Sequence, residues 1–291
     1  MQQNRPVSRH IWLCADDYGI SPAVNAGIRE LIAGGRLNAT SVMVAAPYLG
    51  GDEAPALERL NANEKCAVIG LHVTLTGPFK PMSAGFAPTR DGAFLPLPDM
   101  MRSAVTRQLR VEMLAIEIAT QLQAFEKIFG RLPDFVDGHQ HVHLFPQVRD
   151  AFIKTVAEIA PTAWVRQCGR ANSLRRLHDR KALVLDILSM AFRRRAERQG
   201  LAINPAFAGA YNFTPKAKFA KIFPRFLTGL PDGGLIMCHP GFVDAELKSL
   251  DSLTTLREHE FAYFNSDAFP QALAEHGVAL ARPSGNGGGA A

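Results

Sequence analysis

Short apolar runs alternate along this chain with longer amphipathic stretches, and this alternation constrains the fold more than any other feature. Runs of strand length are expected at 11–15, 39–46, 67–75, 135–137, 163–166, 207–210, 235–238 and 278–281. Helical spacing of apolar residues is expected at 22–33, 109–130, 146–159, 173–198, 215–227 and 254–276, the last broken by Pro270. Alternating strands and helices predict an α/β fold with a mainly parallel sheet, open or closed into a barrel.

Length and composition place the chain among ordinary globular proteins. Its 291 residues fit one large α/β domain or two small ones, and 47% are hydrophobic and 20% charged. No apolar run approaches the roughly 18 residues of a membrane span, and the N-terminus lacks a signal-peptide pattern, so a cytoplasmic protein is predicted. No internal boundary is evident, so we expect one domain at 9–283, an N-terminal extension at 1–8 and a disordered, Gly/Ala-rich tail at 284–291.

The cysteines and the basic residues give no strong functional signal. The four cysteines are far apart, and three fall in or beside predicted strands, which favours buried reduced thiols. Residues 166–198 hold ten Lys/Arg against three Asp/Glu, which would suit nucleic acid or an anionic membrane. No nucleic-acid motif or interleaved aromatic residue accompanies them, so a solvated helix face is favoured and no nucleic-acid partner is expected.

The segment Asp137-Gly138-His139-Gln140-His141-Val142-His143 carries three of the nine histidines within five residues. Neutral imidazole is the commonest protein metal ligand. Rings at i, i+2 and i+4 share one face of a strand, whereas on a helix only the first and last would do so. Three adjacent rings cannot all bind one ion unaided, so the segment indicates a polar, metal-binding active site and leaves open which ring is the ligand.

Ionisable residues also stand at other predicted strand ends, where parallel α/β folds form their active sites. Asp16 and Asp17 end the first strand, although adjacent side chains on an extended strand point in opposite directions and a helix-capping pair is the alternative. His72 lies in the third strand and His239 ends the seventh, and each alone could be a hydrogen-bonded core histidine. Together, one carboxylate and two imidazoles would make a catalytic metal site with open positions.

Four separated motifs resemble the YdjC-like carbohydrate deacetylases, a family that includes chitooligosaccharide (ChbG) and hopanoid-biosynthesis (HpnK) deacetylases. They are Ala15-Asp16-Asp17-Tyr18-Gly19-Ile20-Ser21, Gly70-Leu71-His72, the histidine segment, and Met237-Cys238-His239-Pro240. The resemblance covers about residues 9–282. It implies a distorted TIM-like (β/α) barrel in which a divalent metal assists removal of N-acetyl groups from N-acetylglucosamine-type sugars, chitooligosaccharide or hopanoid-linked. A homodimer would agree with it.

Carried over by position, the resemblance implies Asp17, His72 and His139 as metal ligands, Asp16 as general base and His239 as the acid that protonates the leaving amine. The metal would be zinc or magnesium, and histidine ligands favour zinc.

The remaining candidates are residues expected to bind substrate or support the site: Tyr18, His141, His143 and Arg166, the last of which would orient Asp16 or bind substrate. Tyr18 stands where phenylalanine is usual in the family, and Gln140 where ChbG-like members have histidine. These two departures mean that the resemblance does not identify the particular sugar. The proline-rich loop 77–99 is expected to form a lid or sugar-binding wall. The alternatives are a metal-dependent hydrolase of another amide or ester, and a non-catalytic anion- or nucleic-acid-binding protein.

Overall fold

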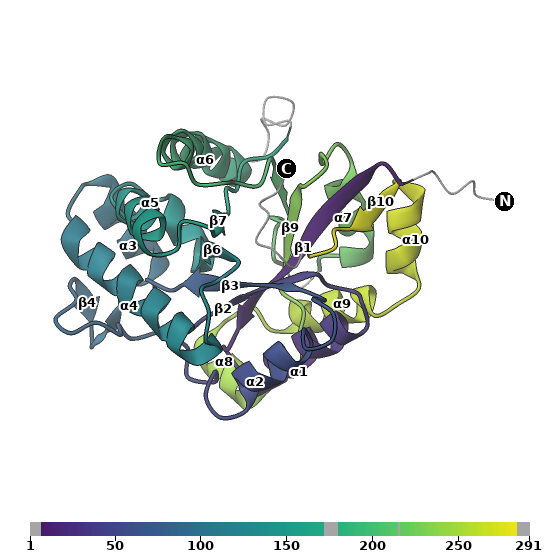
Figure 1. The fold of residues 1–291 in the computed structure, drawn as a ribbon, viewed down its shortest axis with the longest axis horizontal. Coiled ribbons are helices and arrows are strands. Elements are labelled where there is room, and N and C mark those ends of the chain that lie inside the picture. The colour runs from purple at the N-terminus through teal and green to yellow at the C-terminus, as the bar shows by residue number, and fades with distance from the viewer. Residues whose placement is uncertain (1–6, 172–179, 215, 284–291) are drawn as a thin grey trace.

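The computed structural model describes residues 7–171, 180–214 and 216–283, and β1 (Arg9–Tyr18) runs through the middle of its sheet (Figure 1). The strand order is β7-β6-β3-β2-β1-β9-β8, all parallel, with β10 paired to the first residues of β1. The other strands of this sheet are β2 (Ala39–Val42), β3 (Val68–Val73), β6 (Phe135–Gly138), β7 (Trp164–Val165), β8 (Phe207–Ala208), β9 (Leu235–Cys238) and β10 (Val278–Leu280).

An irregular segment links the two outermost strands. The amide of Val165 donates to the carbonyl of Ala202, and the amide of Phe207 donates to the carbonyl of Gly169. The side chain of Asn204 adds bonds to the backbone of Gln167 in both directions. The sheet is therefore curled with helices around it, which confirms the predicted distorted (β/α) barrel formed by a single domain.

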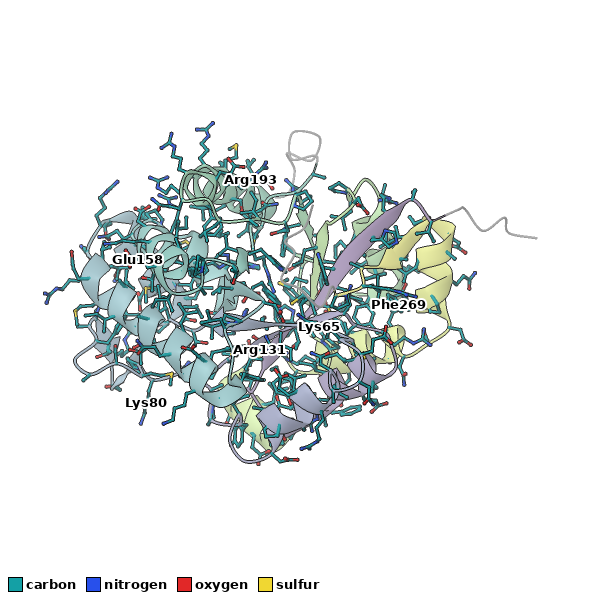
Figure 2. All side chains as sticks on the ribbon, in the orientation of Figure 1. Lys65, Lys80, Arg131, Glu158, Arg193 and Phe269 are labelled. Atoms are coloured by element: carbon teal, nitrogen blue, oxygen red, sulfur yellow. The ribbon has the colours of Figure 1, made fainter. Side chains whose placement is uncertain are left out.

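Helices surround the curled sheet, and side chains fill the space between the two layers (Figures 1 and 2). The helix α1 begins at Pro22, and its N-cap Ser21 accepts a hydrogen bond from the amide of Val24. The helices are α1 (Pro22–Ala33), α2 (Glu53–Arg59), α3 (Leu97–Val105), α4 (Val111–Phe129), α5 (Val148–Ile159), α6 (Arg180–Arg198), α7 (Phe219–Leu227), α8 (Ala245–Leu250), α9 (Thr255–Phe264) and α10 (Ala268–Glu275). Among the described residues, no helix has the length and apolar composition that crossing a membrane requires.

The helix boundaries differ from the predictions at several points. The last predicted helix is two helices, and the break is not at Pro270. The first helix, α9, ends at Phe264, residues 265–267 follow, and Pro270 lies in the first turn of α10. A proline is tolerated there because its missing N–H would have no partner within the helix. The short helices α2, α3 and α8 were not predicted. Some predictions lie outside the described residues: the first residues of the helices predicted to start at 173 and 215, the tail 284–291, and residues 1–6 of the N-terminal extension.

One expectation about a single residue is met, and the expectation of buried cysteines is met in part. Gly130 ends α4 in the left-handed conformation, at φ 67°, as the sequence predicts. Three cysteines (Cys14, Cys168 and Cys238) are buried free thiols, whereas Cys66 is exposed.

Gly70, in the strand that carries His72, is expected to tolerate no side chain. A Cβ atom at this position would lie 2.5 Å from the ring of Phe135, which is buried and stacked on Trp164. Gly70→Ala is therefore expected to lower the free energy of unfolding by about 1–3 kcal/mol, the usual cost of overpacking a core. Chemical denaturation measures it, and Gly50→Ala, at an exposed position with open space, is the control. Equal effects of the two substitutions would contradict the packing argument.

Candidate active site at the carboxyl ends of the strands

A β-bulge at the end of β1 brings two adjacent carboxylates to one site. The pairing of β1 with β2 shifts register between Ala15 and Tyr18, and Asp17 has a positive φ of 71°. A bulge of this kind re-aims a side chain that the strand would otherwise direct to the opposite face. Asp16 and Asp17 are both buried there. On a regular strand the two side chains would point in opposite directions, and this local distortion of the backbone lets both face one site.

Asp17 is the centre of the first group of side chains. Its Oδ1 lies 3.0 Å from Nδ1 of His139 and 3.4 Å from Nε2 of His72, while Arg257 donates to its Oδ2 at 2.6 Å. Burial alone would raise the pKa of Asp17, but Arg257 and His139 outweigh it and hold this pKa well below its usual range. One ligand atom from each of Asp17, His72 and His139 falls within 4.8 Å of the others. These buried nitrogen and oxygen donors fit a divalent cation.

The imidazole of His72 is held between two carboxylates. Its Nδ1 lies 2.5 Å from Oδ1 of Asp137, directly across the β3–β6 pair, and 3.1 Å from the hydroxyl of Ser41. Burial opposes ionisation of this ring, but Asp137 and Asp16 prevail and raise the pKa of His72 to about 10. Nδ1 of the ring thus faces Asp137, and Nε2 faces Asp17.

Asp16 is clamped by a buried guanidinium. Arg166 donates from Nη1 to Oδ2 at 2.7 Å and from Nη2 to Oδ1 at 2.6 Å, and its Nη2 also contacts the sulfur of Cys14 at 3.3 Å. Burial alone would raise the pKa of Asp16, but Arg166 outweighs it and keeps this pKa well below its usual range. Such two-pronged contacts fix the plane of a carboxylate as well as its charge.

The three histidines of the sequence segment diverge, because β6 ends at Gly138 and a tight helical turn follows at His139–Leu144. Gln140 and His141 both have positive φ, which breaks the alternation expected of a strand. Only His139 of the three contacts Asp17 in the described structure.

The other two histidines lie around Arg166 and its neighbours. Nε2 of His143 donates to the carbonyl of Arg166 at 2.9 Å, and the buried ring packs on Phe152 and Phe192, so it holds the backbone of Arg166 in place. Nδ1 of His141 lies 3.5 Å from the sulfur of Cys168. Burial lowers the pKa of both rings, that of His141 to about 3.

His239 follows β9, whose Cys238 pairs with Ala15 of β1, so the ring lies next to the carboxylate pair. Its backbone amide donates to Oε2 of Glu260 at 2.6 Å, and Tyr211 donates to Oε1 of the same carboxylate at 2.6 Å. Phe213 packs near it, with ring centroids 5.5 Å apart and nearly perpendicular planes. Burial lowers the pKa of His239.

Tyr18 is fully buried after Asp17, and its hydroxyl contacts helices instead of the carboxylate–histidine group, whereas the loop 77–99 touches that group. The hydroxyl of Tyr18 donates to the carbonyl of Glu53 at 2.7 Å and accepts from Arg29, so it joins α1 to α2. The loop carries the hairpin β4 (Thr89–Arg90) and β5 (Ala93–Phe94). Its Phe79 packs edge-on against His139, with ring centroids 5.7 Å apart. The loop thus forms one side of the histidine group, where a wall was expected.

Sequence reasoning assigned no role to Asp137, Arg257 and Glu260. Asp137 stands inside the histidine segment and could have been found there, as a carboxylate two residues before a candidate ligand. Arg257 and Glu260 both lie on α9, which carries no recognisable motif, and the structure alone brings them to Asp17 and His239.

Glu260 is expected to make stability depend on pH. Burial raises its pKa to about 7, against the opposing effects of Tyr211 and the His239 amide. Because the folded-state pKa lies above the unfolded one, the stabilisation is complete below about pH 4 and is lost as pH rises through 7, at a cost of about 3 kcal/mol. Glu260→Gln keeps an acceptor for His239 and avoids this cost, so the variant should gain stability over the parent between pH 5 and 8.

Unfolding free energies measured at both pH values test this, with Glu258→Gln, exposed on the same helix, as the matched control. A stability difference between parent and Glu260→Gln that does not change with pH would contradict the assignment.

Comparison with known proteins agrees with the four motifs. A family model described as YdjC-like protein matches residues 10–275. The chitooligosaccharide deacetylase of Escherichia fergusonii is 27% identical over 269 residues, which is 91% of this chain and 94% of that protein. The crystal structure of a candidate cellobiose-phosphate cleavage protein from Enterococcus faecalis V583 shares the fold, with a TM-score of 0.68, 21% identity and coverage of 94% of this chain and 97% of that one. Because the family model spans most of its length, the chain belongs to the YdjC-like family.

Proposed function

We propose that this protein is a metal-dependent carbohydrate N-deacetylase that hydrolyses the acetamido group of an N-acetylglucosamine-type sugar. The observation that carries the proposal is that two adjacent carboxylates at the end of β1 have different partners. Asp17 contacts His72 and His139, as a metal ligand would, while Asp16 is bound by Arg166 and stays outside that group, as a general base would. The family and the chitooligosaccharide deacetylase among its relatives support the substrate class.

Asp17, His72 and His139 would hold the divalent cation, and their two imidazoles favour zinc or a similar transition metal over magnesium. When bound, such an ion polarises the acetyl carbonyl and lowers the pKa of water.

Asp16 is the proposed general base. Arg166 keeps its carboxylate ionised and fixes its plane, so that it is ready to take a proton from the attacking water. Cys14 and Ser41, which contact the same carboxylate, narrow its freedom further.

His239 is the proposed acid, and it gives a proton to the amine as the C–N bond breaks. Among the described residues its Nδ1 is buried without a hydrogen-bond partner, while the residue as a whole is partly exposed, so the ring has a face that substrate can reach. Burial lowers the pKa of His239, whereas Asp17 and Asp16 act to raise it; the proposed step uses the protonated ring, which these two carboxylates stabilise. Glu260 fixes the backbone from which the ring projects.

An acetate-release assay with the zinc-loaded protein tests the function. The panel should include N,N'-diacetylchitobiose, longer chitooligosaccharides and a hopanoid-linked N-acetylglucosamine, beside a non-sugar amide, p-nitrophenyl acetate and a phosphoester. We expect release from at least one N-acetylated sugar, at a kcat/KM above that for the non-sugar compounds. Turnover confined to the non-sugar esters or amides would refute the sugar deacetylase and favour the alternative hydrolase.

A further inference from the structure

Asp137 is a buried carboxylate to which the proposed reaction assigns no step. Its side chain is fully buried, and its Oδ1 lies 2.5 Å from Nδ1 of His72. The two residues are direct partners in the β3–β6 register, so the sheet itself sets this contact. Because an ionised carboxylate can only accept, the hydrogen between the two atoms belongs to Nδ1 of the ring.

Arg166 pairs with Asp137 and holds it in place. Its guanidinium pairs with Oδ2 of Asp137 and, through the clamp described above, with Asp16. Sulfur or oxygen atoms of Cys14, Asp16 and Asp137 lie within 4.8 Å of one another, a grouping that elsewhere could hold a metal. Here the guanidinium contacts all three residues, so an arginine takes the place of a cation in this group, while Oδ1 of Asp137 faces His72.

We infer that Asp137 is a positioning residue that acts through His72. By accepting the Nδ1 hydrogen it selects one tautomer and turns the Nε2 lone pair toward Asp17 and His139. Outer carboxylates of this kind orient metal-binding imidazoles and raise their basicity. The inference rests on the metal site of the proposed function and extends it to a residue outside the ligand set.

A purely structural role would give a different result. If Asp137 served only to neutralise Arg166, its removal would lower stability, because a buried charge loses its partner, without a specific effect on metal affinity. The two roles therefore separate in a metal-binding measurement, and the chain offers a matched control.

Asp134 is that control, a partly buried carboxylate just before the same strand. It pairs with Lys65 and Arg131, both labelled in Figure 2, and accepts from the amide of Ile69 in β3. It thus ties β6 to β3 as Asp137 does, with its contacts at the opposite end of the strand from His72.

The experiment measures the zinc affinity of the full-length protein by competition with a chromogenic chelator. Asp137→Asn keeps the side-chain shape and is expected to weaken zinc binding by about 10–100-fold. Asp134→Asn should leave the affinity unchanged, and thermal melting of both metal-free variants reports their stability. Equal losses of affinity in the two variants, or none in Asp137→Asn, would overturn the inference.

A measurement on the parent protein does not depend on the variants folding. Long-range ¹H–¹⁵N spectra of the zinc-loaded protein are expected to show His72 protonated at Nδ1, and a His72 ring protonated at Nε2 would refute the inference. Acetate release separates the two proposals: an inactive parent with the expected tautomer refutes the deacetylase alone, and an active parent with the other tautomer refutes the role of Asp137 alone.

Discussion

Asp16→Asn is expected to lower kcat for acetate release by about 10²–10⁴-fold, the usual contribution of a general base. The amide has the shape of the carboxylate, so it still fills the space in front of Arg166, but it cannot take a proton from water. Asp17, His72 and His139 are unchanged by the substitution, so the variant should still bind metal.

Kinetics with N,N'-diacetylchitobiose or the best substrate of the panel measure this effect, together with the zinc content of parent and variant. Asp267→Asn, an exposed aspartate, controls for the loss of a carboxylate elsewhere. Full activity of a metal-loaded Asp16→Asn variant would remove Asp16 from the role of base. Loss of metal along with activity would instead make Asp16 part of the metal site.

Single substitutions of the two candidate histidine ligands are expected to have the largest effect on metal content. His72→Ala and His139→Ala should each weaken zinc binding by more than the ~10–100-fold typical of losing an outer partner, because a direct ligand is removed. In each variant, Asp17 would keep only one imidazole beside it.

Metal analysis after dialysis, and chelator competition, measure the loss in both variants. His259→Ala is the matched control, since His259 is an exposed histidine on α9. Full zinc occupancy in either ligand variant would refute the proposed ligand set. Acetate release by those variants should fall in proportion to the zinc they lose.

The parts of the site that the sequence predicted are those carried by local pattern. Alternation of apolar and amphipathic stretches predicted parallel strands, and a strand end is recognisable wherever an apolar run meets an ionisable residue. For this reason Asp16, Asp17, the histidine segment and His239 could be named before their positions were known, and His72 stood out as an ionisable residue inside an apolar strand. The family resemblance then chose His139 from a segment whose three rings the pattern alone left equivalent.

Of the residues that hold those groups in place, only Arg166 was named from the sequence, because it ends a predicted strand, and it does contact Asp16, 150 positions away. Arg257 lies 240 positions from Asp17 and could not be predicted in this way. Such contacts depend on how helices and strands pack after they form. The sequence alone does not distinguish an arginine that will be buried from one that will be exposed. The bulge that turns Asp17 toward the histidines leaves no sequence signal in a single chain either.

The sequence by itself determined which ionisable residues lie at the predicted strand ends. From them followed the family resemblance, and from the alternation of strands and helices followed the α/β architecture. The tertiary structure decided which charges face each other. The periodicity of apolar residues reflects interactions between residues a few positions apart, so it can be recognised in a short stretch of sequence. The placement of Arg166, Arg257, Glu260 and Asp137 depends on packing between distant segments. Burying several carboxylates and histidines together is possible only because those distant partners neutralise and orient them.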